Sequence, residues 1–250
     1  MSASVSQSPT PPTILASAMP ESKWTLLLRA QEAEHPAATK ALGELMMLYW
    51  EPLYSFARHR GWSPEDAEDA VQGFYANLIG RGSVQNVHPS RGRLRTFFLS
   101  SFDNFLISVW RERQAQKRGS GQTLLSLDQA LAEKHYAVEP TDTLSPEKLF
   151  DRRWICTLLE RVLAKLRASY DERGRAGVFD GLQPALEQRG KHFGYIEIGS
   201  KLGLSENAVK QAVFRLRQQY RELIRREIAD TVSDPAEVES ELMALLAALA

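Results

Sequence analysis

The amino-acid sequence predicts an all-α fold made of two helical domains. Apolar residues recur at helical spacing through several segments, and no segment shows the strict alternation of a β-strand. Residues 195–216 also have the spacing of a helix-turn-helix, which is an all-helical unit. With 250 residues, of which 43% are hydrophobic, the chain can bury one large core or two smaller ones.

The first half of the chain is expected to form three or four helices. We expect one over residues 36–60, bent at Pro52 and ended by Gly61. Ser63 then caps the next helix and is followed by a proline at the first helical position. Residues 90–118 predict one or two more helices. The apolar stripes of these helices are Leu42, Leu45, Met46, Tyr49, Leu53 and Phe56; Ala67, Ala70, Val71, Phe74 and Leu78; and Leu94, Phe97, Phe98, Phe102, Phe105, Leu106 and Val109.

The second half is predicted to be helical as well. The segment SPEK at 145–148 starts a helix whose amphipathic part runs from Trp154 to Leu166, and a further helix carries Phe179, Leu182 and Leu186. The helix-turn-helix follows. Its second helix is expected to run on through Ile224.

The prediction divides the chain into five parts. Residues 119–146 lose helical periodicity and contain Gly, Ser, Thr and Pro, which is typical of a flexible linker. The first twenty residues are rich in Ser, Pro and Thr and are expected to be disordered. The parts are a tail (1–20), a first domain (21–118), the linker (119–146), a second domain (147–229) and an acidic C-terminal helical extension (230–250).

The acidic extension has two possible roles. It contains five acidic residues and no basic one, and its apolar residues are Val238, Leu242, Leu245, Leu246 and Leu249. It either folds back on a basic surface as a self-inhibiting lid or completes the core. We favour core completion, because a leucine stripe must be buried whatever its charges do.

The helix-turn-helix is supported by eight positions. Gly199 is small where the two helix backbones touch, Gly203 can adopt the positive φ of the turn, and Val209 supplies the apolar contact. Ser205 can cap the second helix. The remaining buried positions are Ile198, Leu202, Leu204 and Ala212.

The solvent side of this second helix carries side chains that hydrogen-bond to bases and phosphates. Between Lys201 and Arg226 there are seven basic residues against two acidic ones, although the whole chain is neutral, with 31 of each sign. This local charge favours binding to DNA over a purely structural helix-turn-helix. The outward residues are Asn207, Lys210, Gln211, Arg215, Arg217 and Gln218.

A second basic segment lies between Pro89 and Arg118 and is rich in aromatic rings. Seven basic residues stand against Asp103 and Glu112. Most of its rings, at helical spacing, are expected in the core. The arginines need another explanation, and basic grooves beside rings hold unpaired nucleic-acid strands. Asp103 and Asn104 add groups that can read an exposed base edge.

An acidic surface is predicted on the helix that begins after Ser63. Its acids are favoured by the helix dipole, which accounts for one or two of them. Four acids in this stretch also favour docking of a basic partner helix. The outward residues are Glu65, Asp66, Glu68, Asp69 and Gln72.

The sequence predicts no enzymatic, metal or cofactor site. The five histidines are scattered singly, Cys156 is the only cysteine, and no Walker-type phosphate loop occurs. The apolar surroundings of Cys156 predict a buried thiol in a reducing compartment. The N-terminal residues contain no apolar run long enough for export, so we expect a cytoplasmic protein.

The order of these motifs resembles a sigma factor of bacterial RNA polymerase, of the extracytoplasmic-function type with only the second and fourth sigma domains. The motifs are DAEDAVQ, then RGRLRTFFLSSFDN leading to WRERQAQKRG, then a linker, then LGLSENAVKQAVFRLR. The resemblance covers residues 37–229. It implies promoter-specific transcription initiation without catalytic chemistry, with core RNA polymerase and promoter DNA as partners, and with an anti-sigma factor or other regulator as a further possible partner.

The resemblance also implies roles for individual residues. Asp66, Glu68, Asp69 and Gln72 would face the clamp helices of the polymerase's largest subunit. Arg95, Ser100, Asp103, Asn104, Trp110, Arg111, Arg113 and Lys117 would melt and hold the −10 element. Ser205, Asn207, Lys210, Gln211, Arg215, Arg217 and Gln218 would read the −35 element.

The chain departs from the family pattern in three places, one of which is the added acidic tail after Ile228. Asp103 stands where family members commonly carry a basic residue, and an acid there would repel phosphate. About twenty extra residues, 172–192, precede the helix-turn-helix. The alternative function is a helix-turn-helix regulator that binds DNA without polymerase, which would leave the acidic and the basic aromatic segments unused.

Overall fold

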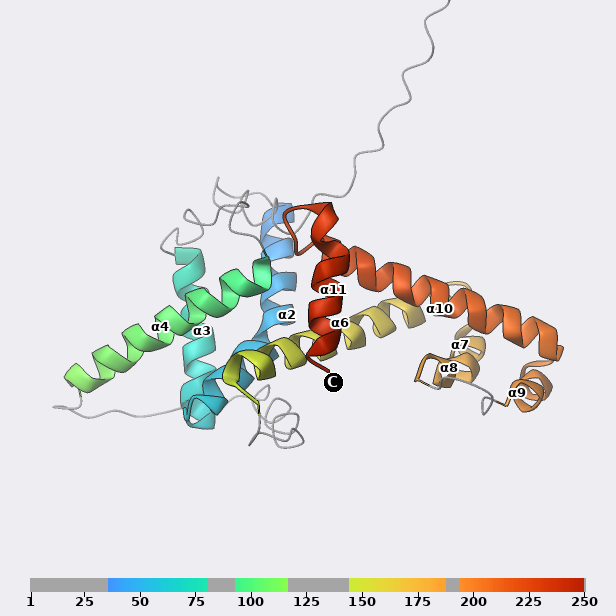
Figure 1. The fold of residues 1–250 in the computed structure, drawn as a ribbon, viewed down its shortest axis with the longest axis horizontal. Helices are drawn as coiled ribbons and strands as arrows, with labels where there is room; N and C mark the ends of the chain where they lie inside the picture. The colour runs from blue at the N-terminus through green and yellow to red at the C-terminus, as the bar shows by residue number, and fades with distance from the viewer. Residues whose placement is uncertain (1–35, 81–92, 117–143, 188–193, 250) are drawn as a thin grey trace, which may run out of the picture.

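The computed structural model describes residues 36–80, 93–116, 144–187 and 194–249. These residues form helices and contain no strand, which confirms the all-α prediction for the described part of the chain (Figure 1). The elements are α2 (Pro36–His59), α3 (Pro64–Gly80), α4 (Leu94–Gln116), α6 (Pro146–Asp171), α7 (Ala176–Leu182), α8 (Pro184–Glu187), α9 (Tyr195–Leu202), α10 (Glu206–Ala229), the 3₁₀ helix η3 (Pro235–Glu237) and α11 (Val238–Ala247).

Serine caps start three of the helices as the sequence predicts. The Ser63 hydroxyl accepts from the Asp66 amide at 3.1 Å at the start of α3. Ser145 caps α6 through the Lys148 amide at 3.3 Å. Ser205 caps α10 in the same way. Each hydroxyl satisfies an amide that has no partner within its helix, so these helix starts are encoded locally.

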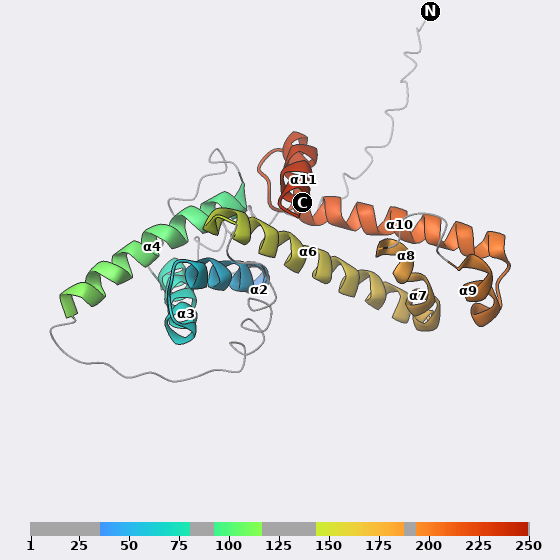
Figure 2. The same ribbon diagram turned by 60° about the horizontal axis from the view of Figure 1, so that its bottom comes forward.

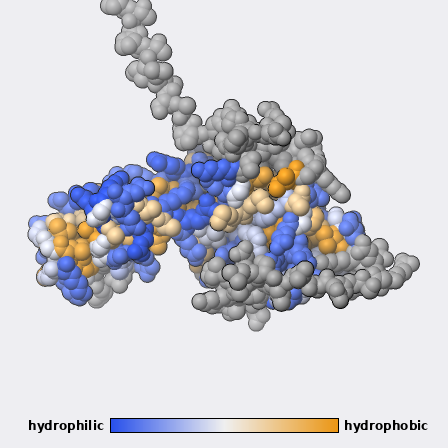
Figure 3. All heavy atoms as spheres, turned by 180° about the vertical axis from the view of Figure 1, so that it is seen from behind, coloured by the Kyte–Doolittle hydropathy of each residue, from blue (hydrophilic) through white to orange (hydrophobic). Residues whose placement is uncertain are grey.

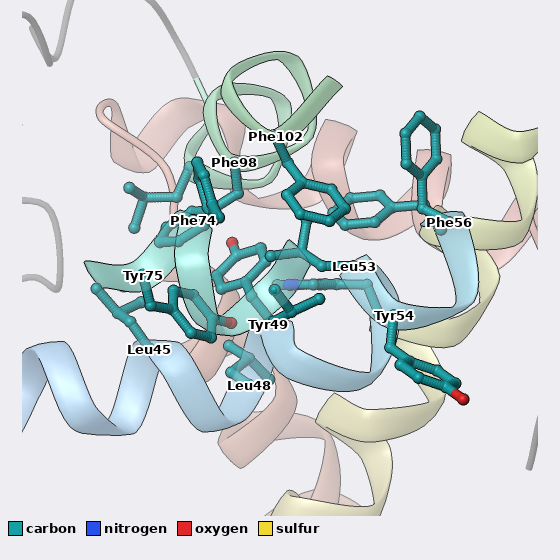
Figure 4. Packing of buried hydrophobic residues seen from close by; sticks show 14 of the residues in the cluster. Leu45, Leu48, Tyr49, Leu53, Tyr54, Phe56, Phe74, Tyr75, Phe98 and Phe102 are labelled. Atoms are coloured by element: carbon teal, nitrogen blue, oxygen red, sulfur yellow. The ribbon is translucent and has the colours of Figure 1, made fainter. Parts of the chain in front are cut away.

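The larger hydrophobic core lies where α2, α3, α4 and the first half of α6 meet. Tyr49 of α2 stacks on Phe98 of α4, with ring centroids 4.1 Å apart. Phe74 of α3 meets Phe102 of α4 edge-on at 5.3 Å. Figure 4 shows these rings of α3 and α4 packed against the side chains of α2. Aromatic pairs of this kind stabilise the packing of α4 against α2 and α3.

The smaller hydrophobic core is formed by the end of α6, by α7, α8 and α9, and by the first half of α10. It contains Leu166 from the end of α6, Phe179 and Leu182 from α7, and Val209 and Val213 from α10. Tyr220 and Leu223 of α10 pack against both cores. The two cores are therefore continuous through α6 and α10, which lie side by side and run in opposite directions (Figure 2).

The first half of α6 packs with the helices that precede the predicted linker. Phe150 and Trp154 of α6 lie against Tyr49, with ring centroids 6.5 and 6.1 Å away. Residues on both sides of segment 119–146 therefore contribute to one core. The division of the chain into two domains stays a prediction.

The C-terminal extension completes the larger core. Val232 and Leu245 are buried in it, and Leu242 packs partly against it. Of the predicted stripe, Leu245 is buried, whereas Val238, Leu242 and Leu249 are only partly buried. Leu246 is an exception, because its side chain is exposed.

Candidate nucleic-acid interface

The corner between α9 and α10 has the tight geometry expected of a helix-turn-helix. A Cβ placed on Gly199 would lie 2.5 Å from the carbonyl oxygen of Leu204, so any larger residue would collide with backbone. Gly203 has a φ of 67°, the left-handed conformation that glycine adopts without strain. The Leu204 amide donates to the Gly199 carbonyl at 2.8 Å. The Leu204 side chain was predicted to be buried, but it is 37% exposed, because its backbone makes the contact with α9.

The outward face of α10 carries most of the side chains predicted to contact DNA. Val209, Val213 and Leu216 are buried against α9 and the core. This places Ser205, Asn207, Lys210, Gln211, Arg215 and Gln218 on the exposed side. Several of them keep local partners that a DNA phosphate or base could replace. Lys210 pairs with Glu206 at 2.6 Å, and Gln218 donates to Glu222 at 3.2 Å.

Arg217 was predicted to read DNA, but its side chain serves the fold. The guanidinium is half-buried and donates two hydrogen bonds to the Ala185 carbonyl, from Nε at 3.1 Å and from Nη2 at 2.7 Å. These bonds satisfy a carbonyl of the short helix α8 and hold that helix against α10. Arg217 also lines a groove together with Lys210, Phe214 and Gln218, so its contact with DNA stays a prediction.

Phe214 lies in the middle of this outward face, and the sequence reasoning missed it. Its side chain is 68% exposed. It stands four residues from Lys210 and from Gln218 and three from Gln211, so all four share one side of the helix. That spacing was visible in the sequence. Ile196 of α9 is also exposed, and Figure 3 shows apolar surface surrounded by hydrophilic surface at the end of the molecule that α9 and the start of α10 form.

The outer surface of α4 has two hollows on opposite flanks of its buried stripe. Leu94, Phe98, Phe102 and Leu106 recur every four residues and face the core. One hollow, of about 360 Å³, is lined by Arg60, Trp62, Asp103, Leu106, Ile107, Trp110 and Arg111. The other, of about 420 Å³, is lined by residues that include Phe74, Ser101, Asn104, Phe105 and Glu112.

Asp103 and Asn104 were predicted to act together, but they line different hollows. Asp103 pairs with Arg60 at 3.1 Å beside Trp110, whereas Asn104 lies on the opposite flank. The Arg60 guanidinium offsets the negative charge of Asp103, which reduces the repulsion of phosphate expected there. Trp110 is exposed and Phe98 and Phe102 are buried, as the assignment of most rings to the core predicts. Ser100 and Arg111 are exposed.

Arg95 was predicted to contact the −10 element, but it lies in a buried ion cluster. Its side chain is 11% exposed. Nε and Nη2 donate to the two carboxylate oxygens of Glu241 at 2.6 and 3.0 Å, and Nη1 donates to Asp151. Burial lowers the pKa of Arg95, but the bonds and charges of the two carboxylates outweigh it and leave the pKa above its usual value. The pKa of Asp151 is raised, because the effect of burial on this carboxylate is larger than the opposing effect of Arg95. The predicted contacts from Arg113 and Lys117 fall outside the described side chains.

The acidic face of α3 is smaller than predicted. Asp69 and Gln72 are exposed, and Asp66 is half-buried. Glu68 was expected on this surface, but it is only 3% exposed and accepts a hydrogen bond from Gln72 Nε2 at 3.0 Å. Its place on the helix next to buried Ala67 and Val71 explains the burial.

An apolar hollow that the sequence reasoning did not identify adjoins this face. It has a volume of about 610 Å³ and lies between α2 and α3. Met47 and Ile79 on its walls are strongly exposed. Exposed apolar side chains next to acids are typical of a protein-binding surface. The lining residues are Met46, Met47, Trp50, Glu51, Gln72, Tyr75, Ala76 and Ile79.

The remaining observations concern Cys156, metal sites and membrane-spanning helices. Cys156 is half-buried, not fully buried as expected. Within the described ranges, no three His, Cys, Asp or Glu side chains gather in a way that could hold a metal ion. No helix among the described residues has the length and apolar character needed to cross a membrane.

Compared with protein-family models, with curated proteins and with solved structures, the chain matches none.

Proposed function

We propose that this chain is a sigma factor that binds core RNA polymerase and directs transcription initiation at specific promoters. The observation that carries the proposal is the corner of α9 and α10, where Gly199, Gly203 and the Ser205 cap present α10 with an outward polar and basic face. The chain acts through binding alone, and the chemistry belongs to the polymerase.

The recognition face of α10 supplies contacts to duplex DNA. Asn207, Gln211 and Gln218 carry amide groups that hydrogen-bond to base edges in the major groove. Lys210 and Arg215 add charge that attracts phosphates. Phe214 presents an apolar surface at the centre of this face, which suits contact with a thymine methyl group.

The flank of α4 next to Trp110 suits an unpaired strand. An exposed indole offers a stacking surface for a base, and Arg60 and Arg111 line the same hollow. Stacking contributes about 1–3 kcal/mol per base, and extrusion of a base from the duplex costs a few kcal/mol. One captured base therefore offsets much of its own unstacking cost.

The surface between α2 and α3 is the proposed contact with the polymerase. It combines the exposed apolar side chains Met47 and Ile79 with the lining acid Glu51. The exposed acid Asp69 stands three residues before the lining residue Gln72 on α3. An apolar hollow with an acidic rim is complementary to a helix that carries both apolar and basic residues. This contact would use the part of α3 whose acids remain at the surface.

Run-off transcription with bacterial core polymerase on random genomic fragments tests the proposal. We expect defined transcripts only when this chain is added, and their starts would give the promoter sequence. The polymerase-independent regulator predicts duplex binding without transcripts and without co-elution with core polymerase. That result would replace the proposed function by the alternative.

A further inference from the structure

The C-terminal extension contacts the start of α4. Figures 1 and 2 both show α11 next to the first turn of α4. The Leu94 amide of α4 donates to the Thr231 carbonyl at 3.0 Å. Arg93 donates to the Ser240 hydroxyl at 3.3 Å. The extension therefore covers the start of α4, which belongs to the predicted basic segment.

A matched set of four charges lies at this contact. Glu241 of α11 is 1% exposed and pairs with both Arg93, at 2.7 Å, and Arg95, at 2.6 Å. Asp151 of α6 supplies the second negative charge. Two guanidiniums thus face two carboxylates in a largely buried place. Removal of either acid would leave a positive charge uncompensated.

The Glu241 carboxylate engages the groups of Arg93 and Arg95 that could otherwise bind a phosphate. Guanidinium groups bind carboxylates and phosphates with the same bidentate geometry. Arg93 and Arg95 precede the exposed flank of α4 that carries Asp103 and Trp110. A strand that ran along α4 toward Trp110 would meet α11 instead of these two arginines.

Helix α11 buries fewer apolar side chains than α2 does. Leu245 is its only fully buried apolar side chain, whereas α2 buries Leu45, Tyr49 and Leu53 among others. Met243 and Leu246 of α11 are exposed. Burial of one leucine contributes about 1.5–3 kcal/mol, and the partly buried Val238, Leu242 and Leu249 add to this. Local opening of such an element is easier than global unfolding.

We propose that α11 is an autoinhibitory arm that holds Arg93 and Arg95 away from nucleic acid until a DNA strand displaces it. This inference rests on the proposed function of α4 in holding an unpaired strand. The hinge is the exposed pair Ser233 and Asp234, which follows the buried residues Thr231 and Val232. In the free protein the arm lowers affinity for single strands, so that opened DNA is held tightly only after the arm is released.

The first test measures, by fluorescence anisotropy, how tightly the full chain binds a fluorescein-labelled single-stranded oligonucleotide of random sequence. Glu241→Gln removes the charge that neutralises the two arginines. We expect about tenfold tighter binding and a steeper salt dependence, with the slope of log K against log salt larger by about one, because freed arginines form new phosphate contacts. A solely structural role of Glu241 would not increase this slope.

The matched control is Glu239→Gln, which removes the same charge from the same helix. Glu239 pairs with Arg225 of α10 at 2.5 Å, and both side chains are exposed. We expect its affinity to stay within about twofold of the wild type, as for a surface ion pair. Equal gains in the two variants would overturn the proposal, since the gain would then reflect net charge alone. An unchanged affinity of Glu241→Gln, or no strand binding by any variant, would overturn it as well.

The second test uses the wild-type chain, so it does not depend on the folding of a variant. Hydrogen–deuterium exchange is measured for α11 and α4 with and without the same oligonucleotide. We expect the amides of α11 to exchange faster when the strand is bound, while those of α4 become protected. Unchanged or slower exchange in α11 would refute the arm. Co-elution of the wild type with core polymerase is measured in parallel, so that failure of the proposed function is recognised separately.

Discussion

Arg217 of α10 donates two hydrogen bonds to the Ala185 carbonyl of α8, at 3.1 and 2.7 Å. This pair holds the short helix α8 against α10, next to the groove that Arg217 lines with Lys210 and Phe214. Neighbouring Arg215 is exposed and lies on a different side of α10. Two arginines only two positions apart therefore have different roles, one in the fold and one at the surface.

Arg217→Ala is expected to lower the stability of the protein. Hydrogen bonds from a charged group to a buried acceptor contribute about 1.5–3 kcal/mol, so the free energy of unfolding should fall by about that amount. Urea unfolding followed by circular dichroism measures it. Arg215→Ala is the control, with a change of stability within about 0.5 kcal/mol and a clear loss of affinity for duplex DNA. Equal stability of the two variants would contradict the assignment.

Gly199→Ala is expected to disrupt the corner of the helix-turn-helix. The added methyl group would lie 2.5 Å from the Leu204 carbonyl oxygen, and backbone cannot move aside as a flexible side chain can. We expect a loss of about 1–3 kcal/mol in stability, as for overpacking, together with loss of duplex binding. Gly177→Ala is the matched control, because no atom lies within 4 Å of its Cβ position. That variant should gain up to about 1 kcal/mol from helix propensity. A tolerated Gly199→Ala would show that the corner can open.

The sequence predicted this corner because its determinants are local. Gly199, Gly203 and Ser205 act within a few residues of one another, and a steric requirement or a missing amide partner explains each of them. The same reasoning did not reveal the partners of Arg95 and Arg217. Their partners Glu241 and Ala185 lie 146 and 32 residues away, and no periodicity reveals such pairs.

Helical periodicity also fails to identify the partner of a helix. It predicted the apolar stripe of α6, but not that Trp154 would pack against Tyr49 across the predicted linker. Phe214 is different, because the sequence alone placed it among Lys210, Gln211 and Gln218. It was missed because aromatic residues at helical spacing are usually buried.

The α2 and α3 surface is expected to bind core polymerase through apolar contact and charge together. Asp69→Lys and Met47→Asp should each weaken co-elution with core polymerase, because one reverses the rim charge and the other places a charge against the partner. Helical circular dichroism should not change, since both residues are exposed. Met243→Asp, at an exposed methionine on α11, is the control. If the Met47 and Asp69 variants co-elute as the wild type does, the docking surface lies elsewhere.

Trp110→Ala is expected to weaken binding of single-stranded DNA without an effect on duplex binding. Loss of one stacking surface should cost about 1–3 kcal/mol, which corresponds to a decrease in affinity of about fivefold to 150-fold. The same fluorescein-labelled oligonucleotide measures the change, and duplex DNA serves as the second ligand. Trp110→Phe should recover part of the affinity, because a smaller ring still stacks on a base. Stability should stay near that of the wild type, since Trp110 is exposed at the rim of its hollow. Equal affinities of Trp110→Ala and the wild type would show that a strand does not use this flank of α4.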